Sequence, residues 1–222
     1  MPVETVVLLP GTASDEVFVR SVFAEPLSQV GAVFTAPRVR TLSERLTALE
    51  NAFTGHPIVV GGVSLGAHVA ASWAVRNPEK CAGLILALPA WTGAPDGAPA
   101  AQAARVSAEI VTGQGLDTAL SGTTGWLRDE LSRAWRGYGD QLVPHLEEAA
   151  DHPAPTLDEL KTLDVPTGIV GCTDDPVHPI EIAREWADAL PRAVLTTTTL
   201  DAYPRALGRA VRAWQQARQE TR

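Results

Sequence analysis

Short runs of apolar residues recur along the chain and alternate with segments whose apolar residues stand three or four apart. The runs are rich in β-branched residues and end near glycine or proline, as buried strands do. They cover residues 3–9, 30–35, 58–61, 83–88, 165–172 and 194–199. Nearly continuous apolar strands that alternate with helices favour a mostly parallel sheet covered by helices on both faces.

The segments between the runs carry helix start and stop signals. Ser14 is placed to cap a first helix, and Pro26 is expected at or near its end. Thr41 opens a capping box. Further helices are expected from Pro179, which fits a first helical turn, and from Pro204. The last strand is more polar than the others, which predicts an edge position.

The alternation is interrupted in the middle of the chain. From residue 92 to about 163 the pattern contains only short helical segments, after a stretch rich in glycine, proline and alanine. This segment is too small for a core of its own. We therefore predict one domain over residues 1–222: a three-layer α/β/α sandwich with a mostly parallel sheet and a small helical cap at about 92–163.

Composition narrows the classes of function. The net charge of −8 and the pI of about 5.1 argue against nucleic-acid and anionic-membrane surfaces, because both need clustered positive charge. The apolar start at residues 6–9 is too short for a signal peptide or a membrane span. Cys81 and Cys172 are expected to be free thiols in a reducing compartment. These features predict a cytoplasmic protein.

One of the turns has a special composition. The apolar run from residue 58 stops in Gly62-Val63-Ser64-Leu65-Gly66, and a helical pattern follows at once. A strand, a tight turn bearing serine and a helix are the layout of a nucleophile elbow. The glycines leave room for the turn because neither has a Cβ. The serine hydroxyl would stand beside a helix N-terminus, whose partial positive charge favours a developing oxyanion.

Other loops at the predicted carboxyl ends of strands carry related signals. Leu8-Leu9-Pro10-Gly11-Thr12 follows the first strand, and Gly171 precedes Asp174-Asp175-Pro176 and Pro179. Together with the elbow and the helical insertion, these segments resemble the α/β-hydrolase superfamily. The resemblance covers most of the chain, although the first antiparallel strands of larger members are missing.

The resemblance implies a role for each matching residue. Ser64 would be the nucleophile, and the backbone N–H groups of Leu65 and Thr12 would form the oxyanion hole. The acid would lie at Asp174 or Asp175. Asp175 is favoured because residues 175–179 match the Asp-Pro-x-x-Pro of the family.

The general base departs from the family pattern. The family keeps a histidine in the loop after the last strand, whereas no histidine follows His178 in this chain. His178 is the best candidate because it stands three residues after Asp175, although a plain helix-capping role is an equal alternative. In the usual strand order its strand lies two positions from the nucleophile strand. That separation is about 10 Å, which an imidazole and a serine hydroxyl can span.

The other histidines are weaker candidates. His145 and His152 lie in the insertion, which could overhang the site. His68 is one helical turn beyond Ser64 and is expected to pack under the elbow. His56 precedes the nucleophile strand, at the wrong end of the sheet.

These residues predict a small serine hydrolase that cleaves an ester or thioester, with a small-molecule substrate and a monomeric or homodimeric state. Gly11, Trp91 and Tyr203 are candidate pocket residues. The pattern calls for no metal and no organic cofactor. The alternative is a non-hydrolytic protein of the same fold, lyase- or cyclase-like or ligand-binding, because the usual catalytic histidine is missing.

Overall fold

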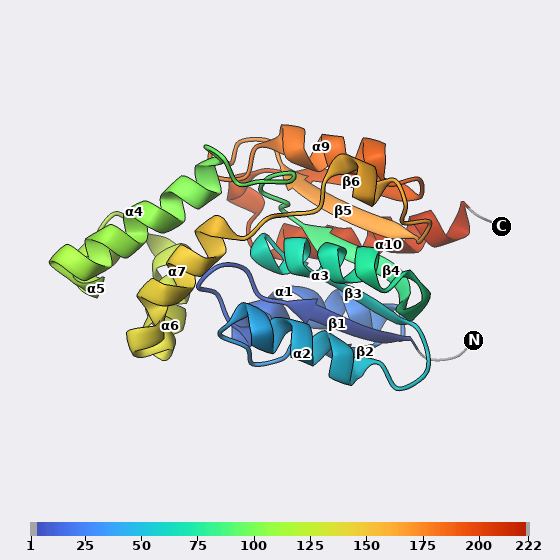
Figure 1. Ribbon diagram of the computed structural model, residues 1–222, viewed down its shortest axis with the longest axis horizontal. Coiled ribbons are helices and arrows are strands. Elements are labelled where there is room, and N and C mark those ends of the chain that lie inside the picture. Colours follow the sequence, from blue (N-terminus) through green and yellow to red (C-terminus); the bar gives the residue numbers. More distant parts are fainter. Residues whose placement is uncertain (1–3, 221–222) are drawn as a thin grey trace.

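A six-stranded sheet forms the middle layer of the protein, whose computed structural model describes residues 4–220 (Figure 1). The strand order is β2-β1-β3-β4-β5-β6, and every neighbouring pair is parallel. The strands are β1 (Thr5–Leu9), β2 (Val33–Thr35), β3 (Ile58–Val63), β4 (Cys81–Ala87), β5 (Thr167–Cys172) and β6 (Ala193–Thr198). The predicted mostly parallel sheet is confirmed. Val3, the expected start of the first strand, lies outside the described residues.

Helices cover both faces of this sheet (Figure 1). Helices α1 (Glu16–Gln29) and α10 (Arg209–Gln219) enclose one core with the side chains of one face. Helices α2 (Leu42–Ala52), α3 (Leu65–Arg76) and α9 (Ile180–Ala189) enclose the core on the other face. The predicted three-layer sandwich is therefore confirmed. β2 and β6 are the edge strands of the sheet. The residues of β6 are more exposed than those of the neighbouring strand β5, which is buried throughout.

The first helix begins and ends differently from the prediction. Its N-cap is Asp15 rather than Ser14, and the Asp15 carboxylate accepts a hydrogen bond from Phe18 N at 3.0 Å. A carboxylate satisfies a free N–H and also interacts favourably with the helix dipole. Pro26 lies inside the helix, which continues to Gln29. Because the closing turn reaches Ala32, β2 is shorter than expected.

Two other local predictions can be compared with the structure. Thr41 forms the predicted capping box, since Thr41 Oγ1 accepts from Glu44 N and the Glu44 carboxylate accepts from Thr41 N. The segment after Pro204 first forms a 3-10 turn, η4 (Arg205–Gly208), and α10 begins only at residue 209. The other 3-10 turns are η1 (Pro78–Lys80), η2 (Gly139–Gln141) and η3 (Leu200–Ala202).

Five helices separate β4 from β5 in the described chain. They are α4 (Pro99–Gln114), α5 (Leu116–Leu120), α6 (Gly125–Tyr138), α7 (Leu142–Asp151) and α8 (Leu157–Leu160). Helices α4–α7 project beyond the carboxyl ends of the strands, at the left of Figure 1. They therefore stand beside the loops in which the candidate site residues lie. Within residues 4–220, no helix has both the length and the apolar character needed to cross a bilayer.

Candidate active site

The turn between β3 and α3 holds Ser64 in a strained backbone conformation. Its φ of 51° and ψ of −115° lie in a region that residues other than glycine rarely adopt. The turn is held from outside, because Ser64 N donates to Ala87 O at 2.8 Å. A Cβ on Gly66 would collide with the carbonyls of Leu9 and Pro10. The Gly-x-Ser-x-Gly spacing thus allows β3, α3 and the first loop to pack against one another.

Three polar side chains form a hydrogen-bonded chain that begins at this serine. Ser64 Oγ lies 3.0 Å from His178 Nε2, and His178 Nδ1 lies 2.8 Å from Asp175 Oδ2. Ser64 is 8% exposed and is one of the residues that line a cavity above the elbow. The structure brings together the three residues that the sequence named as nucleophile, base and acid.

The loop after β5 owes its shape to Asp175. Asp175 Oδ1 accepts from Val177 N at 2.8 Å and from His178 N at 3.3 Å, so the side chain closes an Asx-type turn around its own loop. This turn brings the imidazole back beside the carboxylate three residues earlier. β5 is separated from β3 only by β4, which leaves the ring within reach of Ser64.

The environment of Asp175 keeps its carboxylate ionised. Burial raises the pKa of this group, but the hydrogen bond and charge of His178 and the two backbone amides together lower the pKa below its ordinary value. A carboxylate on Nδ1 fixes the tautomer in which Nε2 is free to accept a proton from the serine. The arrangement is therefore suited to general-base activation of Ser64 Oγ. Asp174 is directed elsewhere: its Oδ1 accepts from Leu200 N at 2.8 Å.

Tyr203 lies in the loop after β6, the last strand of the sheet. Its hydroxyl lies 3.4 Å from Asp175 Oδ2, the oxygen that also faces His178. Burial and the nearby Asp175 charge raise the pKa of Tyr203, so the phenol stays protonated and acts as a donor. Its ring stacks on Trp126 of α6 with centroids 6.0 Å apart, and Trp126 in turn stacks on Phe18 at 6.3 Å.

The remaining histidines lie away from the serine hydroxyl. His68 is fully buried under the elbow, where its Nε2 accepts from Ala90 N at 2.9 Å and burial lowers its pKa to about 3. His145 is also buried, with its pKa lowered to about 3 by burial and nearby arginines. His152 has a lowered pKa for the same main reason. His56 is exposed before β3, at the opposite end of that strand from Ser64.

The loop after β1 brings Gly11 and Thr12 against the elbow. A Cβ on Gly11 would lie 3.5 Å from Ser64 Cβ and 3.1 Å from Val63 O. Within residues 4–220, the backbone N–H groups of Thr12 and Leu65 donate to no other protein group. These are the two amides that the sequence proposed for the oxyanion hole.

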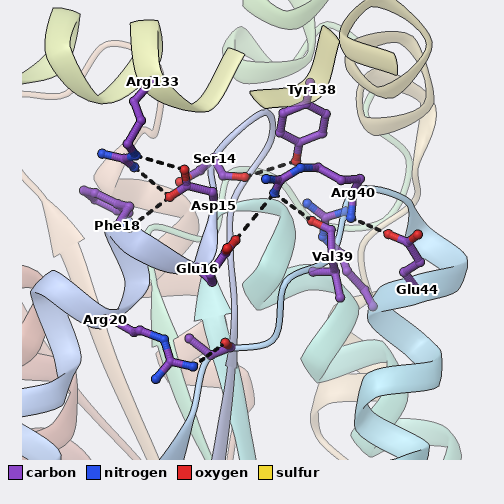
Figure 2. Close-up of polar contacts among 12 residues, drawn as sticks. Ser14, Asp15, Glu16, Phe18, Arg20, Val39, Arg40, Glu44, Arg133 and Tyr138 are labelled. Carbon is purple, nitrogen blue, oxygen red and sulfur yellow. Dashed lines mark hydrogen bonds and ion pairs between the residues drawn. The ribbon is translucent and has the colours of Figure 1, made fainter. Parts of the chain in front are cut away.

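Side chains from α6 hold the far end of this loop (Figure 2). Arg133 binds both carboxylate oxygens of Asp15, at 2.6 and 3.1 Å. Tyr138 donates from its hydroxyl to Ser14 O at 3.1 Å. Arg133 also pairs with Glu130 at 2.6 Å. The loop beside Ser64 is therefore tied to the helices that separate β4 from β5.

A cavity of 360 Å³ opens above Ser64 and is lined mostly by apolar side chains. Gly11, Thr12 and Tyr203 contribute to its lining, whereas Trp91 lies outside it, with its ring against His68 at 4.5 Å between centroids. Small residues of α4 and larger ones of α6 form the far wall: Ala100, Ala103, Ala104, Ser107, Trp126, Leu127, Leu131 and Trp135.

A second hollow, of 640 Å³, lies on the outer side of α4 and α7. It is lined by charged residues such as Arg105 and Glu147 and contains none of Ser64, His178 and Asp175. Within the described range no group of three or more histidine, cysteine or acidic side chains could hold a metal ion. Cys81 and Cys172 are buried free thiols.

Sequence reasoning missed one charged residue near the site. Arg45 of α2 is fully buried and contacts Gly11 of the loop beside Ser64. A signal was present, because Arg45 stands three residues after Leu42 and four before Leu49 on a face that is otherwise apolar. An arginine at a core-facing helical position is unusual and marks a specific contact.

Comparison with known proteins agrees with this architecture. The family model described as serine aminopeptidase, S33, matches residues 38–207. The chain therefore belongs to this family of α/β-hydrolase proteins. None of the curated proteins compared with the chain matches it.

Several solved structures share the fold. A carboxylesterase structure from the ammonia-oxidizing Thaumarchaeon Nitrososphaera gargenis has a TM-score of 0.79 and 12% identity, over 100% of this chain and 93% of the other. A thermophilic esterase from Thermogutta terrifontis has a TM-score of 0.68 and 19% identity, over 98% and 89% of the chains. The enol-lactonase from Burkholderia xenovorans LB400 has a TM-score of 0.68 and 16% identity, over 100% and 91%. At these identities the similarity establishes the fold.

Proposed function

We propose that this protein is a serine hydrolase that cleaves a small ester or thioester through an acyl-Ser64 intermediate. The observation that carries the proposal is the hydrogen-bonded chain from Ser64 Oγ through His178 to Asp175, with links of 3.0 and 2.8 Å. Membership of an α/β-hydrolase family supports a hydrolytic role. The non-hydrolytic alternative rested on the missing histidine, and His178 supplies an imidazole in contact with the serine.

The proposed reaction has two halves. Ser64 Oγ attacks the substrate carbonyl while its proton moves to His178 Nε2, and the charge that develops on the carbonyl oxygen is stabilised by the Thr12 and Leu65 N–H groups. Collapse of the tetrahedral intermediate breaks the bond to the leaving alcohol or thiol, which takes the proton from His178. A water molecule then attacks the acyl group by the same route and restores Ser64.

The cavity lining favours a neutral, apolar acyl group. Besides Asp175, the carboxylate that lines the cavity is Glu130, and it is already ion-paired with Arg133 at 2.6 Å, a cation that it shares with Asp15. A substrate with a free amino terminus would find no unpaired carboxylate there. We therefore expect esters of apolar acids to be better substrates than aminoacyl compounds, although the matching family is described as serine aminopeptidases.

A fluorophosphonate probe and a series of nitrophenyl esters test the proposal together. The wild type should be labelled, and Ser64→Ala should abolish both labelling and turnover. His178→Ala should lower kcat by about 10²–10⁴-fold, the usual contribution of a general base. His56→Ala, which changes an exposed histidine far from the elbow, is the matched control and should keep full activity.

Two outcomes would overturn the proposal. An unlabelled wild type without turnover on any ester would exclude a working serine nucleophile. A His178→Ala variant with full activity would exclude His178 as the base. An aminoacyl nitroanilide that is turned over faster than the esters would exclude only the preference for apolar acyl groups.

A further inference from the structure

Arg45 is a fully buried cation that has no carboxylate partner. Within residues 4–220 no acidic oxygen lies within 4.0 Å of its guanidinium. It donates instead to Thr41 O at 3.2 Å and to Gly11 O at 3.3 Å, and its Nη2 lies 3.5 Å from His145 Nε2. Burying an arginine away from an acid is unfavourable. Its position is explained by what it binds on the loop beside Ser64.

The bond to Gly11 O fixes a peptide plane next to the nucleophile. Gly11 O also accepts from Ser14 N at 3.2 Å, so two donors hold this carbonyl. The peptide between Gly11 and Thr12 is trans, since the cis peptide of the described chain is Tyr203-Pro204. In a planar trans peptide the N–H points away from the C=O. Holding Gly11 O toward Arg45 therefore directs Thr12 N–H the opposite way.

Both residues of this peptide belong to the cavity above Ser64. Gly11 and Thr12 line the cavity together with Ser64, whereas Arg45 is not part of its lining. Thr12 N–H has no protein acceptor in the described part of the chain. The Arg45 contact is thus made by the carbonyl of this peptide group, the unbonded N–H stands on the other side of the same group, and both of its residues line the cavity that contains Ser64.

We propose that Arg45 is a positioning residue that orients and strengthens the Thr12 N–H donor of the oxyanion hole. This inference rests on the proposed hydrolase function. The guanidinium holds the peptide plane, and its charge on the carbonyl polarises the group, because hydrogen bonds in a chain reinforce one another in a low-dielectric interior. His145 serves as a neutral acceptor that keeps the guanidinium in place; burial lowers the pKa of His145 to about 3.

The test compares Arg45→Met and Arg45→Lys with the wild type. Methionine suits a buried site, because replacing a buried charge by an apolar side chain is often tolerated. We expect Arg45→Met to lower kcat per labelled site by about 10–100-fold, with KM changed less than about threefold, since loss of a whole oxyanion donor costs about 10²–10³. Arg45→Lys should recover part of the loss. An alkyl boronic acid, which forms a charged adduct on serine, should lose affinity in parallel with kcat.

Arg20→Met is the matched control. Arg20 also donates to a backbone carbonyl, Ala36 O at 3.0 Å, but neither residue lines the cavity above Ser64. The Arg20→Met variant should therefore have the same kcat and the same boronate affinity as the wild type. If Arg45→Met is folded and keeps both, the inference is overturned. If it does not fold, Arg45→Gln takes its place, because it removes the charge and shortens the side chain; full kcat with unchanged boronate affinity in that variant overturns the inference. A wild type that is neither labelled nor active would instead refute the proposed function, and this inference with it.

Discussion

The imidazole of His68 should make the stability of this protein depend on pH. The ring is fully buried in α3, one helical turn beyond Ser64, and its Nε2 accepts from Ala90 N at 2.9 Å. Burial is the main cause that lowers its pKa from 6.5 to about 3. The folded protein therefore keeps His68 neutral over a pH range in which the unfolded chain binds a proton at this residue.

The size of the effect follows from proton linkage. Above pH 6.5 neither state binds the proton, so His68 has no effect on stability there; between pH 6.5 and 3 only the unfolded state binds it, and the free energy of unfolding falls as the pH falls. Each pH unit is worth about 1.4 kcal/mol. At pH 5 the loss from His68 is therefore about 2 kcal/mol relative to pH 8.

Urea unfolding at pH 8 and pH 5 measures this loss. His68→Gln keeps an acceptor near the position of Nε2 but cannot be protonated, so its loss of stability between the two pH values should be smaller than that of the wild type by about 2 kcal/mol. His56→Gln is the control, because His56 is exposed. Equal pH dependence in His68→Gln and the wild type would refute the assignment of this pH dependence to His68.

Three further predictions concern the site and the elbow. Asp175→Asn should lower kcat by about 10³–10⁴-fold with intact folding, because the amide removes the charge that fixes and stabilises the His178 ring; unchanged steady-state kinetics would contradict the role of Asp175. Tyr203→Phe should lower kcat by less than about tenfold, since its bond to Asp175 is 3.4 Å long; a loss as large as that of Asp175→Asn would show that this phenol has a larger role. Gly66→Ala should lower the melting temperature, because its Cβ would meet the Leu9 and Pro10 carbonyls; equal thermal unfolding curves would refute this packing argument.

Much of the fold was present in the local pattern of the sequence. The apolar runs located the strands, because a strand buried on both faces needs an almost uninterrupted apolar segment. The capping box at Thr41 marked the start of α2 correctly. The errors were at element ends, as where Asp15 rather than Ser14 caps α1, because neighbouring polar residues compete for the same free N–H group.

For the candidate site, too, the sequence predicted the local features, and the tertiary structure decided which distant residues meet. The sequence alone determined the elbow, since the steric demands of Ser64 and its two glycines act over a few residues. The relation of His178 to Ser64 was decided by tertiary structure, because their contact spans 114 positions and depends on strand order and on the turn that Asp175 closes. The role of Arg45 was hidden for the same reason: its acceptor, Gly11, is 34 positions away and is a backbone atom, which carries no sequence signal.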